Sequence, residues 1–429
     1  MDPERRSVVY DIRRKLRRGH SDDIFSQFLT LGGYSALAAL LMFALHLVMA
    51  RLLGPEQYAS YGTFVAVLFT LLFCLTSIHL VIIRFVSYHR SRFQYEQINY
   101  IISRALKWAF FAGFASFILV LVFAEYISGF FHIQGVASTV MLGFVVWFTM
   151  LVPVFEGAFK GLEDFGALGR FRLIEATLRL VLATTLVLLG FSVGGALFGL
   201  ALGTFAALMY CYRGIYQLQR LKSVKPSMEQ IRRFAVPVVV TMVSIALLLN
   251  IDIILVKHYF PAAEAGVFAA ASLIAKVPFL VSMVFVGVMF PKITQLHADG
   301  KNSVPVLKNA LGVVVPLVAV FTLLSFFFSG IFFRVLFGPE YTIGPILGFY
   351  VFGMGCLAIT VILAIYLLAV RQDRISFMLP LFFMLLLALL TQFHDTLFQV
   401  MVVVMLVMAV VLAYALYIAR NVLEFDYFL

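Results

Sequence analysis

Charged residues are scarce in this 429-residue chain, and their scarcity limits what the protein can be. Asp, Glu, Lys and Arg make up 12% of the sequence and hydrophobic residues 63%, and the mean hydropathy is +1.03. A soluble protein of this length needs a polar coat and polar loops, which this composition cannot supply. Because the apolar runs last about twenty residues rather than alternating in short segments, the sequence predicts a polytopic membrane protein built of helices.

Chemistry-bearing motifs are also missing. The three cysteines, Cys74, Cys211 and Cys356, all fall inside apolar runs, so no disulfide framework is expected. We find no P-loop, no metal-spaced cluster and no serine or cysteine triad in a supporting context. No gap between apolar runs could hold an extramembrane domain, and the first run does not resemble a cleavable signal. These absences argue against an attached catalytic module, a cofactor and ATP hydrolysis by the chain itself. Whatever drives the protein is then an H⁺ or Na⁺ gradient or the downstream consumption of its product.

Apolar runs long enough to cross a bilayer are what the sequence has in abundance. A spanning helix needs about 20 apolar residues, and twelve segments qualify: 28–50, 58–83, 103–124, 137–159, 170–190, 193–214, 234–256, 265–289, 304–328, 343–369, 375–393 and 397–418.

The basic residues alternate with these runs. The net charge is +11, with 32 Lys and Arg residues. If each run crosses the membrane once, only Arg51, Lys257 and Arg334 fall on one face of the membrane. Arg179 and Lys276 lie within runs, and all the other Lys and Arg residues lie on the opposite face. This is the asymmetry of the positive-inside rule. It predicts that both termini are cytoplasmic. The expected location is a plasma membrane, the inner membrane of a bacterium. The charge reflects topology, so nucleic acid is not an expected partner.

A polar stretch, LQRLKSVKPSMEQIRR, divides the runs into six and six. Shifting the chain by 207 residues sets ARLLGPEQYASYGT against KHYFPAAEAGVFAA, each an external turn that leads into a helix rich in small residues. We therefore expect an all-α fold of about twelve transmembrane helices in two pseudo-symmetric six-helix lobes around a central cavity. The predicted divisions are a basic cytoplasmic N-terminal segment, an N-lobe, a basic cytoplasmic linker and a C-lobe, at residues 1–27, 28–217, 218–232 and 233–429.

Several stretches in order along the chain resemble one family. They are ARLLGPEQYASYG (50–62), IIRFVSYHR (82–90), EGAFKGLEDFGALGRF (156–171), LGFSVGGALFGL (189–200), NIDIILVKHYFPAAEAGVFAAASLIAKVPF (250–279), FPK (290–292) and LFGPEY (336–341). With them the chain is similar to the polysaccharide transport branch of the multidrug/oligosaccharidyl-lipid/polysaccharide (MOP) exporter superfamily, which includes the O-antigen flippases of lipopolysaccharide assembly.

The resemblance implies a fold like that of the multidrug (MATE) exporters, with a cavity open to one side at a time. It also implies movement of an isoprenoid-diphosphate-linked oligosaccharide from the inner to the outer leaflet. The expected partners are that lipid-linked oligosaccharide, the bilayer and polysaccharide assembly proteins.

Cations inside the apolar runs are the candidate contacts for the diphosphate. A head group of this charge needs a polar passage through about 30 Å of hydrocarbon, and intramembrane charges usually face such a passage. Lys276 is the first candidate, and the alternative is a lysine that pairs with a nearby acid for packing. Arg179 is the second, and the alternative is a structural pair with Glu175, four residues before it. Arg84 could meet the head group at the cytoplasmic mouth or act as a snorkelling anchor. Lys160 could bind cargo or pair with Glu156 at i,i+4 spacing.

An acid in the seventh run is the candidate for ion coupling. Asp252 could bind H⁺ or Na⁺ with Asn250 as a co-ligand, or it could neutralise a neighbouring cation. His46 and His79 are isolated in apolar runs without clustered Cys, Asp or Glu. They are therefore expected to be hydrogen-bonded core residues rather than metal ligands.

Two other functions stay open. A cation-coupled multidrug exporter of the same superfamily would need acids in its N-terminal half to attract cationic drugs. The first run contains no acid between Thr30 and Ala50, which favours an anionic cargo. A membrane glycosyltransferase or polysaccharide polymerase would need several convergent polar groups in a sizeable loop, and the predicted external gaps are short.

Overall fold

The computed structural model of the protein describes residues 24–133, 136–219, 221–225, 229–298, 301–341, 343–370, 372 and 374–426. Most of the predicted basic N-terminal segment, together with residues 220 and 226–228 of the predicted linker, lies outside these ranges.

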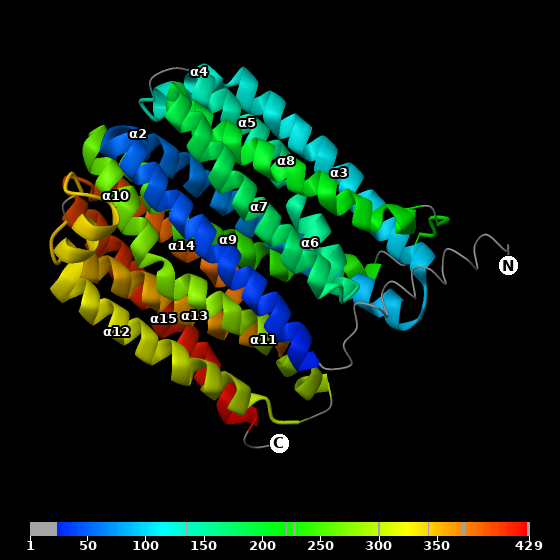
Figure 1. Ribbon diagram of the computed structural model, residues 1–429. Coiled ribbons are helices and arrows are strands. Elements are labelled where there is room, and N and C mark those ends of the chain that lie inside the picture. Colours follow the sequence, from blue (N-terminus) through cyan, green and yellow to red (C-terminus); the bar gives the residue numbers. More distant parts are fainter. Residues whose placement is uncertain are drawn as a thin grey trace. The chain divides into compact units, whose positions relative to one another are not determined.

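Helices form nearly all of the described chain (Figure 1). In chain order they are α2 (Ile24–Ser91), α3 (Tyr95–Val122), α4 (Ala124–Phe130), α5 (Val136–Thr149), α6 (Val152–Gly161), α7 (Phe165–Leu186), the π-helix η1 (Val187–Phe191), α8 (Ser192–Gln219), α9 (Glu229–Tyr259), α10 (Ala262–Ala275), α11 (Val277–Ala298), α12 (Val304–Leu336), α13 (Leu347–Ala369), α14 (Arg374–Gln392) and α15 (Leu397–Asp426).

Ten stretches of helix in the described residues are long and apolar enough to cross a membrane. Two of these stretches, Leu31–Arg90 and Phe165–Tyr216, contain 60 and 52 residues, whereas one crossing needs about 20. Each is broken by a glycine at positive φ, Gly54 at 68° and Gly190 at 93°, a conformation that glycine adopts without steric cost. Each long stretch therefore holds two of the predicted runs, and each of the twelve runs is largely helical, with residues 343–346 before the start of α13 the longest exception. The predicted all-α membrane fold is confirmed.

The described chain divides into two compact units. The first comprises Met1–Leu53 and Leu71–Ala235, as far as these residues are described. Within it α7 packs along α8, and α5 packs against both α3 and α8 (Figure 1). The N-terminus of α7 is capped by Asp164, whose side chain accepts a hydrogen bond of 3.0 Å from the amide of Ala167, so that one orphan donor of the first turn is satisfied.

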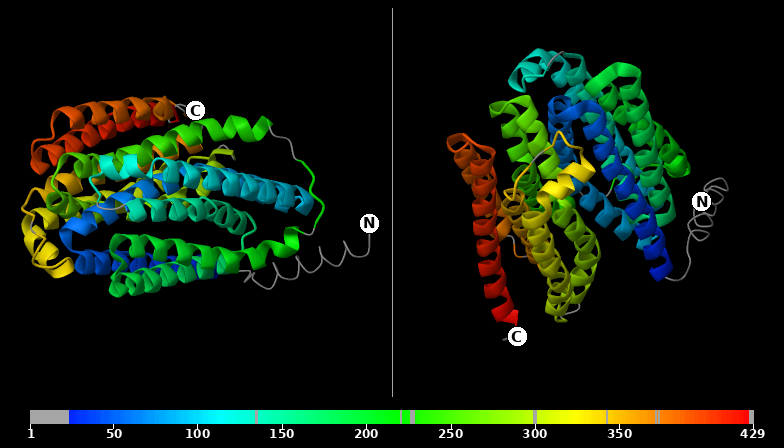
Figure 2. Two further views of the ribbon diagram at one scale, coloured as in Figure 1. Left: turned by 90° about the horizontal axis from the view of Figure 1, so that it is seen from above. Right: turned by 60° about the vertical axis from the view of Figure 1, so that its left-hand side comes forward.

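The second unit comprises Gly54–Thr70 and Val236–Leu429, so part of α2 groups with the C-terminal half. Helix α13 is its central element, because α10, α11, α12, α14 and α15 all contact it. Its sequence is apolar on every side, and 83% of its membrane-spanning window is buried, as expected for a helix surrounded by others. Helices α14 and α15 run side by side at the C-terminal end of the chain (Figure 2).

The segment 54–70 meets α10 through small residues. A Cβ atom built on Gly266 would lie 2.0 Å from the carbonyl oxygen of Pro55, and one built on Gly62 would lie 2.8 Å from the Cβ of Ala269. Gly62 and Ala269 are also the residues that the 207-residue shift pairs.

Candidate functional site

Two glycines bring α6 close to α2 in the first unit. A Cβ on Gly157 would lie 3.0 Å from the side chain of Ile82, and one on Gly161 would lie 2.6 Å from that of Val86. Small residues four apart allow two helix backbones to approach closely inside a membrane. The hydroxyl of Ser87 also donates a hydrogen bond of 3.3 Å to the carbonyl of Gly161. The polar side chains next to this crossing are therefore brought together.

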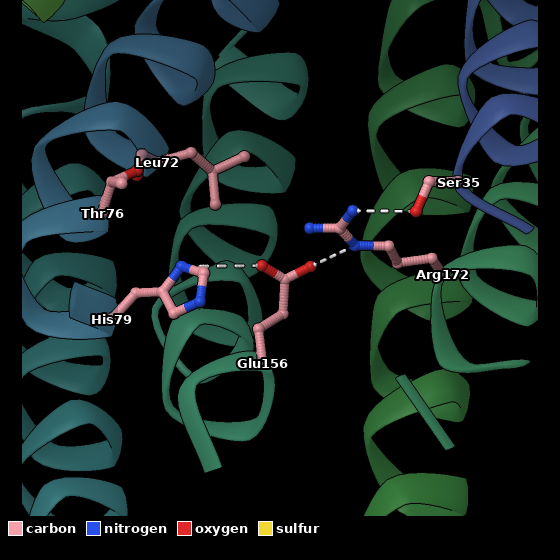
Figure 3. Close-up of polar contacts among 6 residues, drawn as sticks. All are labelled: Ser35, Leu72, Thr76, His79, Glu156 and Arg172. Carbon is pink, nitrogen blue, oxygen red and sulfur yellow. Dashed lines mark hydrogen bonds and ion pairs between the residues drawn. The ribbon is translucent and has the colours of Figure 1, made fainter. Parts of the chain in front are cut away.

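Glu156 is the centre of the resulting polar cluster (Figure 3). Its Oε1 accepts a bond of 2.7 Å from Nε of Arg172, and its Oε2 lies 3.9 Å from Nδ1 of His79. Nη1 of Arg172 donates to the hydroxyl of Ser35 at 3.1 Å. The side chain of Glu156 is 15% exposed and that of Arg172 is 30% exposed. We name Ser35, His79, Glu156, Lys160 and Arg172 the α6 cluster.

Lys160 belongs to the cluster but does not pair as predicted. Of the two alternatives for Lys160, the ion pair with Glu156 does not form among the described residues, because Arg172 reaches across from α7 and bonds to the carboxylate instead. Among the described residues, Nζ of Lys160 has neither a hydrogen-bond acceptor nor an ion-pair partner. The cluster thus holds two cations and one carboxylate in addition to His79.

His79 is buried at 8% exposure. Its Nδ1 faces Glu156 beyond hydrogen-bond distance, and its Nε2 is buried without a partner in the described structure. The predicted hydrogen-bonded core histidine is therefore buried but not hydrogen-bonded. No group of three His, Cys, Asp or Glu side chains able to hold a metal occurs in the described part of the chain.

Arg179 forms the second charged contact of the first unit. Its Nη2 lies 2.7 Å from Oε1 of Glu175, at the predicted i,i+4 spacing, and its Nε donates to the hydroxyl of Thr204 at 2.9 Å. Gly203 makes the second contact possible, because a Cβ there would lie 2.7 Å from the backbone nitrogen of Arg179. Both charged side chains are 12% exposed. Arg84, the remaining predicted cation of this unit, is exposed on α2.

Lys276 lies in the second unit at a break between helices. It caps the C-terminus of α10, and α11 begins at the next residue. Its Nζ donates to Oδ1 of Asn250 at 3.0 Å, and the amide of Asn250 donates in turn to the carbonyl of Ala246 at 3.1 Å. The hydrogen-bond partner of this partly buried ammonium group is therefore a neutral amide.

Asp252 is fully buried and has its own partners. Its Oδ2 accepts from the hydroxyl of Tyr350 at 2.5 Å, its Oδ1 accepts from the amide of Ile253 at 2.7 Å, and Tyr350 also contacts Ser272 at 3.0 Å. Asn250 and Asp252 do not converge on one point in the hydrogen bonds that they make. Sequence reasoning did not identify Tyr350 or Ser272, nor did it identify Ser35 as a partner of Arg172.

Comparison of the fold with solved structures places the chain in a class. It superposes with a TM-score of 0.72 on an inward-facing MATE-family multidrug resistance transporter of the MOP superfamily, at 14% identity over 90% of this chain and 94% of that one. It superposes with a TM-score of 0.71 on the lipid II flippase MurJ. The sequence identity is 15%, and the alignment covers 91% of this chain and 87% of that one. The TM-score is 0.61 for a MOP transporter from Pyrococcus furiosus that is described as having a binding pocket of reverse polarity. The sequence identity is 14%, and the alignment covers 93% of this chain and 96% of that one. The protein is a multi-pass membrane protein with the MOP-superfamily fold.

Sequence comparison gives the family. A profile described as "Polysaccharide biosynthesis protein" matches residues 26–297. The chain belongs to this family, and the predicted resemblance is confirmed. A search of curated protein sequences found no match to the chain.

Proposed function

We propose that this protein is a flippase that moves an isoprenoid-diphosphate-linked oligosaccharide from the cytoplasmic to the outer leaflet during surface polysaccharide synthesis. The observation that carries this proposal is Lys276, a cation inside a membrane-spanning segment of a chain that belongs to a polysaccharide biosynthesis family. Its hydrogen-bond partner is neutral, and the neighbouring carboxylate of Asp252 is held by Tyr350. Among the described residues, no carboxylate is bonded to the ammonium group, although Asp252 attracts it electrostatically. We infer that a phosphate competes with Asp252 for this charge.

The physical need for such a cation follows from the cargo. Removing a diphosphate from water is very costly unless opposite charge replaces the hydration. Lys276, Arg179, Lys160 and Arg84 supply positive charge in or beside the spans of a protein with few charges of any kind. We infer that the cargo's phosphates contact these side chains during alternating access, while its lipid tail stays in the bilayer.

We further infer that Asp252 couples transport to an ion gradient. A carboxyl group takes up a proton on a single oxygen, whereas Na⁺ needs several oxygen ligands. Asn250 Oδ1 already accepts from Lys276, which supports H⁺ over Na⁺. The charge asymmetry of the sequence supports cytoplasmic termini in a bacterial inner membrane.

The test combines a deletion strain with lipid analysis. We expect loss of the protein to accumulate a diphosphate-linked oligosaccharide on the cytoplasmic leaflet, and the wild-type gene to clear it. Lys276→Gln should abolish clearance and Lys276→Arg should restore part of it, because the charge returns. Arg334→Gln removes an exposed cation at the end of α12 and is the matched control, expected to clear the lipid fully.

The competing function is export of cationic drugs, and the similarity to the MATE transporter is the observation in its favour. An unchanged lipid profile with gained sensitivity to cationic drugs in the deletion strain would replace the flippase proposal with this one. An unchanged profile with loss of polymer assembly in a purified system would instead indicate a polymerase.

A further inference from the structure

The α6 cluster carries more positive charge than its carboxylate neutralises. Arg172 and Lys160 are both within electrostatic reach of Glu156, yet only Arg172 is bonded to it. A carboxylate and a phosphate bind a guanidinium through the same geometry, two oxygens against two N–H groups. Glu156 contacts Arg172 through one such bond, from Nε to Oε1, and so occupies one of the N–H groups that a phosphate oxygen would use.

A carboxylate displaced from Arg172 would need another cation, because an unpaired buried charge is costly. The second oxygen of Glu156 already faces His79 Nδ1 at 3.9 Å. The charged groups that face the imidazole are Glu156 and Lys160 on α6 and Arg172 on α7. Beyond Arg172 lies Glu175, which is bound to Arg179. Glu156 is therefore the single acid in direct reach that could stabilise a protonated His79 among the described residues.

We propose that Glu156 is an internal substitute for the cargo's phosphate: it neutralises Arg172 when cargo is absent, and moves to a protonated His79 when phosphate binds Arg172 and Lys160. The proton comes from the aqueous phase and returns to it when cargo leaves. This inference rests on the proposed function, and it adds a site and a residue set to it. Ser35 keeps the guanidinium oriented through its bond to Nη1 while the partners exchange.

The first experiment measures binding of farnesyl diphosphate to the full-length purified protein by titration calorimetry, with farnesol as the probe that lacks phosphate. Because Glu156→Gln removes the competing negative charge, it should tighten diphosphate binding about tenfold, while Arg172→Lys and Lys160→Gln should weaken it about tenfold. The matched control is Glu163→Gln, which removes a carboxylate from a different Arg–Glu pair of the same unit and should leave binding unchanged. Unchanged or weaker binding by Glu156→Gln overturns the proposal.

The second experiment counts protons and does not depend on the stability of Glu156→Gln. Titrations of the wild type at one pH in two buffers of different ionisation enthalpy give the protons taken up on binding. The wild type should take up more than His79→Gln, since only the wild type can protonate the imidazole. Equal uptake by the two proteins overturns the proposal, and so does the absence of diphosphate binding to the wild type. The lipid accumulation test stands apart from both readouts, so a failure here and a failure of the flippase function are distinguishable.

Discussion

The hydrogen bond between Tyr350 and Asp252 offers a direct measure of how a buried acid is held in this fold. Both side chains are fully buried, and the O–H···O distance is 2.5 Å. Tyr350→Phe keeps the ring and its contact with Phe268, so the substitution removes the hydroxyl without leaving a large cavity. The hydroxyl of Ser272 loses a partner at the same time.

The magnitude follows from the charge of the acceptor. A hydrogen bond to a charged group contributes about 1.5–3 kcal/mol, and a neutral one about 1 kcal/mol. Tyr350→Phe should therefore lower the free energy of unfolding by about 1.5–3 kcal/mol if Asp252 is ionised. A double-mutant cycle with Asp252→Asn should give a coupling energy of about 1–2 kcal/mol, within the range found for residues in direct contact.

The assay is reversible unfolding by SDS in mixed micelles, followed by tryptophan fluorescence or circular dichroism. Tyr414→Phe is the control: its ring contacts Phe382, and its hydroxyl meets no polar group in the described part of the chain. It should change the unfolding free energy by less than about 0.5 kcal/mol. If Tyr350→Phe were no more costly than Tyr414→Phe, the structural role assigned to this bond would be refuted.

Two further outcomes are expected from the packing. Gly266→Ala should destabilise the protein by about 1–3 kcal/mol, because its Cβ would strike the carbonyl of Pro55, whereas Gly330→Ala meets nothing within 4 Å and should be neutral in the same SDS titration. Asn99→Ala should lower the free energy of unfolding by about 1–3 kcal/mol, because it removes the 2.6 Å hydrogen bond to the carbonyl of Leu221. Limited proteolysis should cleave the connection after α8 faster in this variant, and cleavage at the wild-type rate would contradict the expectation.

Local features of the sequence predicted the helices well. Hydropathy alone placed all twelve runs, because a lipid-crossing helix must satisfy its own backbone and hide its polar groups. The i,i+4 rule also predicted the pair Glu175–Arg179. The same rule failed for Glu156 and Lys160, because it considers one helix and takes no account of the guanidinium that arrives from α7.

Partners far apart along the chain could not be predicted from periodicity. Tyr350 lies 98 residues from Asp252, and Arg172 lies 137 residues from Ser35. A signal for the α6 cluster was nevertheless present in the sequence. Gly157 and Gly161 are four residues apart beside Glu156, a spacing that marks close helix contact in membranes. Which helix they would meet still depends on the fold.

Arg172 and Lys276 have different partners, so replacing each of them should separate stability from transport. Arg172 neutralises the Glu156 carboxylate, which is 15% exposed, so Arg172→Gln leaves that carboxylate without its bonded cation. The substitution should lower the free energy of unfolding by about 2–4 kcal/mol. This is somewhat below the value for a fully buried pair, because Arg172 itself is 30% exposed. Lys276 is bonded to an amide, and glutamine can replace that bond, so Lys276→Gln should change the unfolding free energy by less than about 1 kcal/mol while abolishing lipid clearance. SDS titration and lipid analysis of both variants measure this contrast. A large loss of stability in Lys276→Gln would mean that the ammonium group serves packing, and the availability of its charge to a phosphate could not then be maintained.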